Sequence, residues 1–314
     1  MTLLRARLLD LLLVLFGVSV LTFLMIRLIP GDAVAIMLGA NSEVTPDRIA
    51  ALRAQIGLDQ PILLQYLHWL TAVLQGDLGV SLWTREPVSR EIAAHVGPTV
   101  ELATLALALG AGLAVPLGVI MAWLRGRGWD IALQIASVAG LTIPSFWLGI
   151  MLILLLTAVA PELQMLGYVP FAEDPLGNLA RMILPAASLS LPIMANLARL
   201  LRSAMLEALQ QDFVRTARAK GLRETLVFFR HALRNALIPF VTSVGITTGY
   251  LLGGAIVVEQ VFAIPGLGRL ILGAIAERNY PLVQASILVV TTSFVLVNFL
   301  VDMLYAAIDP RVRA

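Results

Sequence analysis

The sequence predicts an all-α membrane protein that crosses the bilayer six times, and composition, apolar runs and charge distribution together predict it. Of the 314 residues, 59% are apolar and 13% are charged, whereas a soluble domain has about 25% charged residues. The apolar residues gather into long runs, and Arg and Lys gather between alternate runs. Since backbone polar groups in hydrocarbon need internal partners, runs of this length form helices.

Six apolar runs are candidate transmembrane helices, because ~20 apolar residues cross a hydrocarbon core of about 30 Å. The runs are 11–26, 102–124, 131–161, 182–198, 235–258 and 279–301. The first and fourth are short, but the flanking Arg27, Arg181 and Arg199 can snorkel and so extend them. The third is too long for one straight span, and Pro144 predicts a kink or an extension outside the membrane.

The basic residues predict that both termini are cytoplasmic. With the N-terminus inside, the inner segments hold 14 basic and 7 acidic residues, and the outer segments hold 8 basic and 13 acidic. This is the sense of the positive-inside rule. Arg5 and Arg7 before the first run also resemble a signal peptide, but RLIPGD follows instead of a small-residue cleavage site. We therefore expect an uncleaved first span.

The order of runs and loops predicts the domain organisation. Residues 1–29 form the first transmembrane helix, and 30–98 form an extracytoplasmic lobe. Residues 99–308 form a five-helix core that contains a cytoplasmic loop at 202–236, and 309–314 form a cytoplasmic tail.

The extracytoplasmic lobe is expected to hold two helices. Thr45 is a candidate cap and Gly57 a candidate stop for the first, and the second is expected to begin at Pro61 and end before Gly76. Such a lobe suits either the docking of an external partner or the capping of the helix bundle, and the sequence leaves both open.

The inner loop at 199–234 carries eight basic and three acidic residues, with sparse but periodic apolar residues. This pattern predicts a short amphipathic helix that ends at Gly221. One interpretation is a membrane-surface helix held by anionic lipid. The other is a docking element for a cytoplasmic protein, which the small residues Thr216, Ala217 and Ala219 favour because they let another backbone approach.

The inner loop also carries a family resemblance. EALQQDFVRTARAKGL (207–222) and RHALRNALIPFVT (230–242) resemble the loop signature of binding-protein-dependent ABC importer permeases, and more narrowly the B-type permease subunit of the dipeptide, oligopeptide and nickel importers. Further matching pieces run along the chain in the same order: IRLIPGD (26–32), GLDQP (57–61), GDLGVS (76–81), PTVELA (98–103), VVEQVFAIPGLGR (257–269) and LYAAIDPRVR (304–313).

The resemblance implies a type I ABC importer permease fold in a bacterial inner membrane. It also implies four kinds of partner: a second homologous permease, two ATP-binding subunits, an extracytoplasmic solute-binding protein and the lipid bilayer. ATP and Mg would be used by the ATP-binding subunits, with no cofactor in this chain.

The inner loop would then couple this chain to the ATPase. The residues that the resemblance assigns to coupling are Asp212, Phe213, Arg215, Thr216, Ala217, Ala219, Gly221 and Leu222. The general family signature has a Glu-Ala-Ala triplet where this chain has Arg215, Thr216 and Ala217, so the acidic anchor is absent there. Asp212 and Arg215 are the first candidates to replace it.

The sequence contains no motif for catalysis. The single lysine, Lys220, is followed by Gly221 and Leu222, so no phosphate-binding P-loop is present. Neither HExxH nor GxSxG occurs, the chain has no cysteine, and its three histidines are scattered. We therefore expect a non-enzymatic transport subunit without a metal site. An ion-coupled secondary transporter is the alternative class, but it would use ionisable groups in the middle of its spans, and these are almost missing.

Small and polar residues inside the spans give further expectations. Gly245, Gly249 and Gly253 form a stripe suited to close helix packing. Hydroxyl residues are candidate lining for a solute path, although such hydroxyls often bond their own backbone; they are Thr142, Ser145, Ser243, Thr247 and Thr248. Glu101 and Glu259 lie at outer helix ends and Asp302 near an inner one, where caps or ion pairs are favoured over a role in the path.

Overall fold

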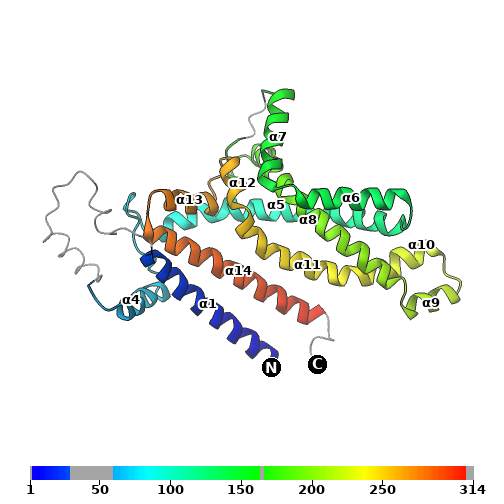
Figure 1. Ribbon diagram of the computed structural model, residues 1–314, viewed down its shortest axis with the longest axis horizontal. Coiled ribbons are helices and arrows are strands. Elements are labelled where there is room, and N and C mark those ends of the chain that lie inside the picture. Colours follow the sequence, from blue (N-terminus) through cyan, green and yellow to red (C-terminus); the bar gives the residue numbers. More distant parts are fainter. Residues whose placement is uncertain (1, 29–58, 163–165, 309–314) are drawn as a thin grey trace. The chain divides into compact units, whose positions relative to one another are not determined.

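The computed structural model describes residues 2–28, 59–162 and 166–308, and most of these residues are helical. Within these ranges, β pairing is limited to an isolated antiparallel bridge between Val80 and Pro87. The prediction of an all-α protein is therefore confirmed (Figure 1). The helix expected between Thr45 and Gly57 and the tail at 309–314 lie outside the described residues.

The long helices follow the six apolar runs. They are α1 (Thr2–Leu28), α5 (Val88–Trp123), α6 (Gly128–Thr142) with α7 (Ser145–Val159), α8 (Pro175–Ala208), α11 (Leu233–Gly254) and α14 (Tyr280–Ile308). Among the described residues, α1, α5, α8 and α14 are each long and apolar enough to cross a membrane, and α6 with α7 make a fifth crossing if the pair is one bent span. Helix α11 is 22 residues long and occupies the fifth predicted run.

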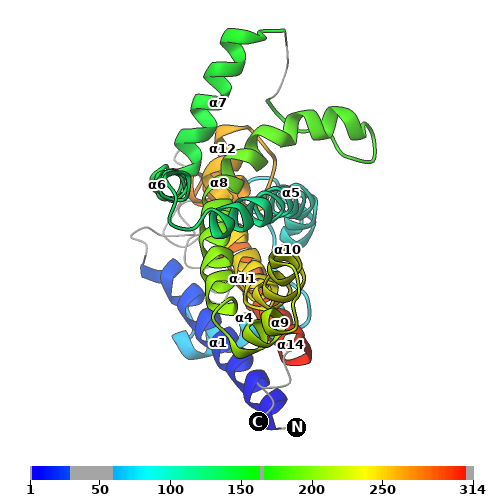
Figure 2. The same ribbon diagram turned by 90° about the vertical axis from the view of Figure 1, so that its right-hand side faces the viewer.

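The kink expected at Pro144 is present. Helices α6 and α7 meet at an angle of 98°, and Figure 2 shows α7 leaving the direction of α6. A residue before proline is pushed out of the helical region, and Ile143 accordingly adopts φ −75° and ψ 120°. The next helix restarts with the N–H of Leu148 bonded to the carbonyl oxygen of Pro144 at 3.0 Å.

Helix α8 runs past both of the arginines that flank the short fourth run. Its N-terminus is capped by Asp174, whose Oδ1 accepts a hydrogen bond from the Gly177 N–H at 3.0 Å, and Pro175 occupies the first turn. Arg181 and Arg199 therefore lie within the helix, as expected for snorkelling side chains.

The chain divides into two compact units, residues 1–97 with 266–296 and residues 98–265 with 297–314. The first contains α1, α4 (Ile62–Leu74), the start of α5, α13 (Leu267–Ala276) and the first part of α14. The second contains the rest of α5 and α14 and the helices between them, with the short α9 (Asp212–Ala219), α10 (Glu224–Leu226), π-helical η1 (Val227–Ala232) and α12 (Ile256–Val261).

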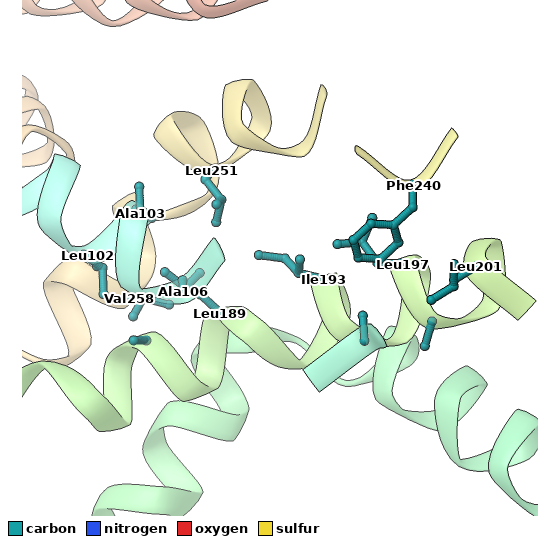
Figure 3. Close-up of a cluster of buried hydrophobic side chains, with 14 of the residues drawn as sticks. Leu102, Ala103, Ala106, Leu189, Ile193, Leu197, Leu201, Phe240, Leu251 and Val258 are labelled. Atoms are coloured by element: carbon teal, nitrogen blue, oxygen red, sulfur yellow. The ribbon is translucent and has the colours of Figure 1, made fainter. Parts of the chain in front are cut away.

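Helix α8 is the centre of the second unit. It packs against α6, α7 and α11, and fourteen of its residues are buried. Figure 3 shows the apolar side chains of α5, α8 and α11 meeting in one cluster, which includes Leu102, Leu189, Ile193, Leu197 and Phe240.

Helix α5 approaches α8 through a stripe of small residues that repeats every four positions. Ala106, Gly110, Ala114 and Gly118 are all buried. A Cβ atom at Gly110 would lie 2.7 Å from Cγ2 of Ile193, and one at Gly118 would lie 2.7 Å from the carbonyl oxygen of Ala198. The two backbones can approach this closely because neither glycine has a side chain, a packing mode common between membrane helices.

Replacing Gly118 with alanine should therefore destabilise the protein. The new methyl group meets a backbone oxygen that cannot rotate away, so we expect a loss of ~1–3 kcal/mol, the usual cost of overpacking. Gly112→Ala is the matched control, since Gly112 is exposed on the same helix with nothing within 4 Å of a Cβ. Reversible unfolding in detergent, followed by circular dichroism, measures both. Equal stabilities for the two variants would contradict the close approach.

Candidate functional site

The candidate site is the inner loop that joins α8 to α11, and its centre is helix α9. Asp212 in the first turn and Arg218 in the last turn suit the helix dipole. After Lys220, Gly221 adopts a positive φ of 74°, a conformation that glycine tolerates best. The N–H of Gly221 bonds the Arg218 carbonyl at 2.9 Å, and the N–H of Leu222 bonds the Ala217 carbonyl at 3.3 Å. These two bonds form a Schellman motif, so the helix ends at the glycine, as the sequence predicts.

Helix α9 has a buried inner face and an exposed outer face. Val214 and Ala217 are buried against Val227, with Leu222 packed on the same small cluster. Six of the eight predicted coupling residues are exposed: Asp212, Phe213, Arg215, Thr216, Ala219 and Gly221. Ala217 and Leu222 face the cluster instead, so they hold the helix in place and do not present a surface. We call the six exposed residues the outer face.

An aromatic group attaches the loop to the end of α5. The π-helical turn η1 carries Phe228 and Phe229, whose ring centroids lie 4.8 Å and 6.0 Å from that of Trp123. A π turn holds more residues than an α turn, so consecutive side chains point closer together and both phenylalanines reach the same tryptophan. The loop is thus held at the base of α5 as well as at α8 and α11.

A buried ion pair lies beneath the loop. Nε and Nη2 of Arg202, on α8, donate to the two carboxylate oxygens of Asp130, on α6, at 2.8 and 2.7 Å. The Asp130 side chain is 3% exposed and the Arg202 side chain 17% exposed. Asp130 also accepts hydrogen bonds from the Gly126 N–H and from Gln134. This network joins the α5–α6 turn to the C-terminal part of α8.

This support could not be predicted from the sequence. The sequence offers only isolated charges at Asp130 and Arg202 and apolar residues at Trp123 and Phe228. Asp130 and Arg202 are 72 positions apart, and no local pattern connects residues at such a distance. A lone carboxylate at the start of an apolar run was the available signal, because such a charge needs a partner when it is buried.

Two further ion pairs lie on the loop surface. Arg215 contacts Asp212 at 3.1 Å, so the two residues predicted to replace the acidic anchor are paired with each other. Arg218 contacts Glu224 through two hydrogen bonds, of 2.5 and 3.1 Å. The hydrogen bond from Arg218 lowers the pKa of Glu224 and outweighs the opposing effect of burial. The carboxylate therefore stays charged at neutral pH.

The predicted path and packing residues have varied surroundings. Thr142, Thr247 and Thr248 donate hydrogen bonds to backbone carbonyls three or four residues earlier in their own helices. Ser145 and Ser243 are half-buried. In the glycine stripe, a Cβ at Gly245 would clash with Val301 of α14, Gly249 is buried, and Gly253 has nothing within 4 Å. Their roles in the path and in packing remain predictions.

Glu101 and Glu259 each accept a hydrogen bond from a hydroxyl group that is distant in the sequence. Thr99 donates to Glu259 at 2.6 Å, and Glu259 is fully buried. Tyr168 donates to Glu101 at 2.9 Å, and burial together with this bond raises the pKa of Tyr168 to about 12. The side chain of Asp302 lies outside the described residues.

The described helices form a multi-pass bundle with the fold found in ABC transporters. A chain of the MetNI methionine ABC transporter, solved in inward-facing conformations, superposes with a TM-score of 0.58 over 70% of this chain and 96% of its own length, at 17% identity. A second crystal form of that transporter gives 0.55. At these identities the likeness concerns the fold alone.

The chain belongs to the family of binding-protein-dependent transport system inner membrane components. The family match covers residues 114–314, and the match to the family's N-terminal part covers residues 1–103. A putative peptide transport system permease protein of Brucella abortus (strain 2308) is 42% identical over 296 residues, 94% of each chain. The dipeptide transport system permease protein DppB of Escherichia coli (strain K12) is 41% identical over 320 residues, 95% of this chain and 94% of its own.

The ion pair beneath the loop gives a stability prediction. Asp130→Ala leaves Arg202, whose side chain is only 17% exposed, without its partner, so we expect a loss of about 3 kcal/mol. Adding Arg202→Met should recover part of the loss, because both charges are then absent. Unfolding of the single and double variants in detergent measures the coupling energy.

Asp212→Ala is the control for this cycle. It removes a carboxylate whose side chain is 91% exposed and paired with an arginine side chain that is 75% exposed, and exposed pairs contribute less than about 1 kcal/mol. A coupling energy near zero between Asp130 and Arg202 would show that the pair does not hold the α6 and α8 ends together.

Proposed function

We propose that this chain pairs with a second, homologous permease to form the translocation path for peptides or similar small solutes. An extracytoplasmic binding protein delivers the solute, and two partner ATP-binding subunits use ATP and Mg. The observation that carries the proposal is the outer face of α9. This surface is exposed, whereas the opposite side of the helix packs on Val227 of the same chain.

The names of the relatives support the choice of solute, since the Brucella and Escherichia proteins are named as peptide and dipeptide permeases. Their match over at least 94% of each chain means that the whole permease is compared and not one shared segment.

The supports of α9 favour coupling over simple attachment to lipid. A displacement of the outer face would be transmitted by the packing of Val214 on Val227, which lies just before α11. The edge-to-face contact of Phe228 and the stacking of Phe229 on Trp123 connect the same turn to α5. Two helices that line the core of this unit, α11 and α5, are therefore connected to one surface. A lipid-bound helix would instead turn several bulky apolar residues outward, whereas Phe213 is the single large apolar residue of the outer face and its other members are charged or small.

A substitution in the outer face should weaken the coupling between this chain and the ATP-binding subunits. We expect Thr216→Arg to lower solute-stimulated ATPase activity at least about tenfold in the reconstituted complex, because a long cation then occupies the surface where a partner must approach; such a loss equals about 1.4 kcal/mol. Ser89→Arg is the matched control, a small exposed residue in the first turn of α5. ATPase activity and uptake are measured together, and copurification of the ATP-binding subunits reports assembly. If the Thr216→Arg variant shows wild-type ATPase activity and uptake, the outer face does not take part in coupling.

The proposed orientation is tested with single cysteines, since the natural chain has none. Gln75→Cys and Arg215→Cys both place the thiol at exposed positions. In spheroplasts, a membrane-impermeant maleimide should label residue 75 directly and residue 215 only after permeabilisation, because the positive-inside rule places them on opposite sides. The reverse pattern would overturn the topology.

A further inference from the structure

Helix α4, which follows the first span, presents three faces, and nine of its thirteen residues define them. Its sequence, ILLQYLHWLTAVL, places Tyr66, Trp69 and Val73 on one side. Leu63, Leu67 and Leu74 fall within about 40° of each other on a second side, at 100° per residue. Gln65, His68 and Thr71 follow at intervals of three and form a third, polar side. The three faces lie roughly 120° apart.

The first face packs on α1. Tyr66 is buried, with its ring centroid 5.2 Å from that of Phe23, and Trp69 lies 5.7 Å from the same ring. The Tyr66 hydroxyl lies 2.8 Å from Oγ of Ser19, which itself donates to the Phe16 carbonyl at 2.7 Å. A serine hydroxyl has one proton, so Tyr66 is the donor to Ser19. This bond satisfies both hydroxyls and fixes where α4 meets α1.

The contact with α1 lies within the apolar stretch of α1. Ser19 belongs to the window Leu8–Met25, which is apolar enough to cross a membrane. It lies six residues before Met25, about 9 Å along the helix axis. Interfacial amphipathic helices bury their apolar face ~5–10 Å into the headgroup and acyl boundary. Because α4 touches α1 at this depth, the bilayer that surrounds α1 also reaches α4.

The second face is apolar and uncovered. Leu63 is 68% exposed, Leu67 45% and Leu74 77%. On α1, Leu12 and Leu13 are similarly exposed at 54% and 68%, as expected for a span that faces lipid. The third face of α4 is exposed at His68 and Thr71, with one apolar residue, Leu64, exposed at 45% between them. One side of the helix therefore suits hydrocarbon and another suits water.

We propose that α4 is a membrane-interface helix and does not project into the aqueous space as a free lobe. Leu63, Leu67 and Leu74 insert among the acyl chains of the leaflet that adjoins residues 27–101, and Gln65, His68 and Thr71 face the headgroups and water. Trp69 is placed as interfacial tryptophans are, with its ring at the headgroup level. The ligand of this surface is bulk phospholipid, recognised by apolar burial alone.

Depth-dependent quenching tests this assignment. The chain lacks cysteine, so Leu67→Cys and Thr71→Cys variants of the full-length protein, with the subunits that copurify, can each carry one NBD fluorophore. They are reconstituted in phosphatidylcholine–phosphatidylglycerol vesicles that contain an acyl-chain nitroxide lipid or are exposed to iodide. Leu13→Cys on α1 and the exposed Ser89→Cys are the lipid and water standards.

We expect the ratio of nitroxide to iodide quenching at residue 67 to match that at residue 13 and to exceed that at residue 71 at least about threefold, as an in-plane amphipathic helix requires. Quenching of residue 67 by iodide as strong as at residue 89 would show an aqueous lobe and overturn the proposal. Protection of residue 67 from both quenchers would show a protein partner on this face and also overturn it. Leu63→Cys and Leu74→Cys repeat the measurement on the same face if Leu67→Cys fails to accumulate.

Discussion

The close approach of the α5 and α8 backbones is the constraint on which the second unit depends. In a bilayer, lipid is as apolar as leucine, so helices gain little from burying side chains and associate where their backbones can touch. Gly110 and Gly118 allow this against Ile193 and Ala198. With α8 held in this way, α6, α7 and α11 have a common surface on which to pack, and the loop after α8 acquires a fixed starting point.

Much of the fold could be predicted because hydrophobicity and proline act locally. The six runs and the break at Pro144 needed no knowledge of neighbours. Helix pairing is different, since the stripe at Gly245 and the stripe at Gly110 look alike in the sequence. The structure shows both Gly110 and Gly118 against another helix, whereas Gly253 meets nothing within 4 Å. A stripe of small residues identifies a helix surface that is able to pack closely. Which helix packs against it depends on the tertiary structure.

The candidate site was predictable to a similar degree. The amphipathic pattern and Gly221 located α9 and its end, because a Schellman motif depends on residues that adjoin in sequence. Ala217 is buried and Thr216 is exposed because Val227, which follows the turn at Gly221, packs on one side of α9. The sequence of α9 alone does not contain this information. The residues that support the loop, Trp123, Asp130 and Arg202, lie on three different helices. No pattern in the sequence connects them.

The loop and its base differ in how they respond to dissolved ions. Mobile ions screen charges that water surrounds, and they act far less on buried ones. The Arg215–Asp212 pair is open to solvent, with side chains 75% and 91% exposed, whereas Asp130 is 3% exposed. Rising ionic strength therefore weakens the electrostatics of the outer face first and leaves the junction of α6 and α8 in place. Concentrated electrolyte would release a charged protein bound to α9 before it loosened the helices beneath.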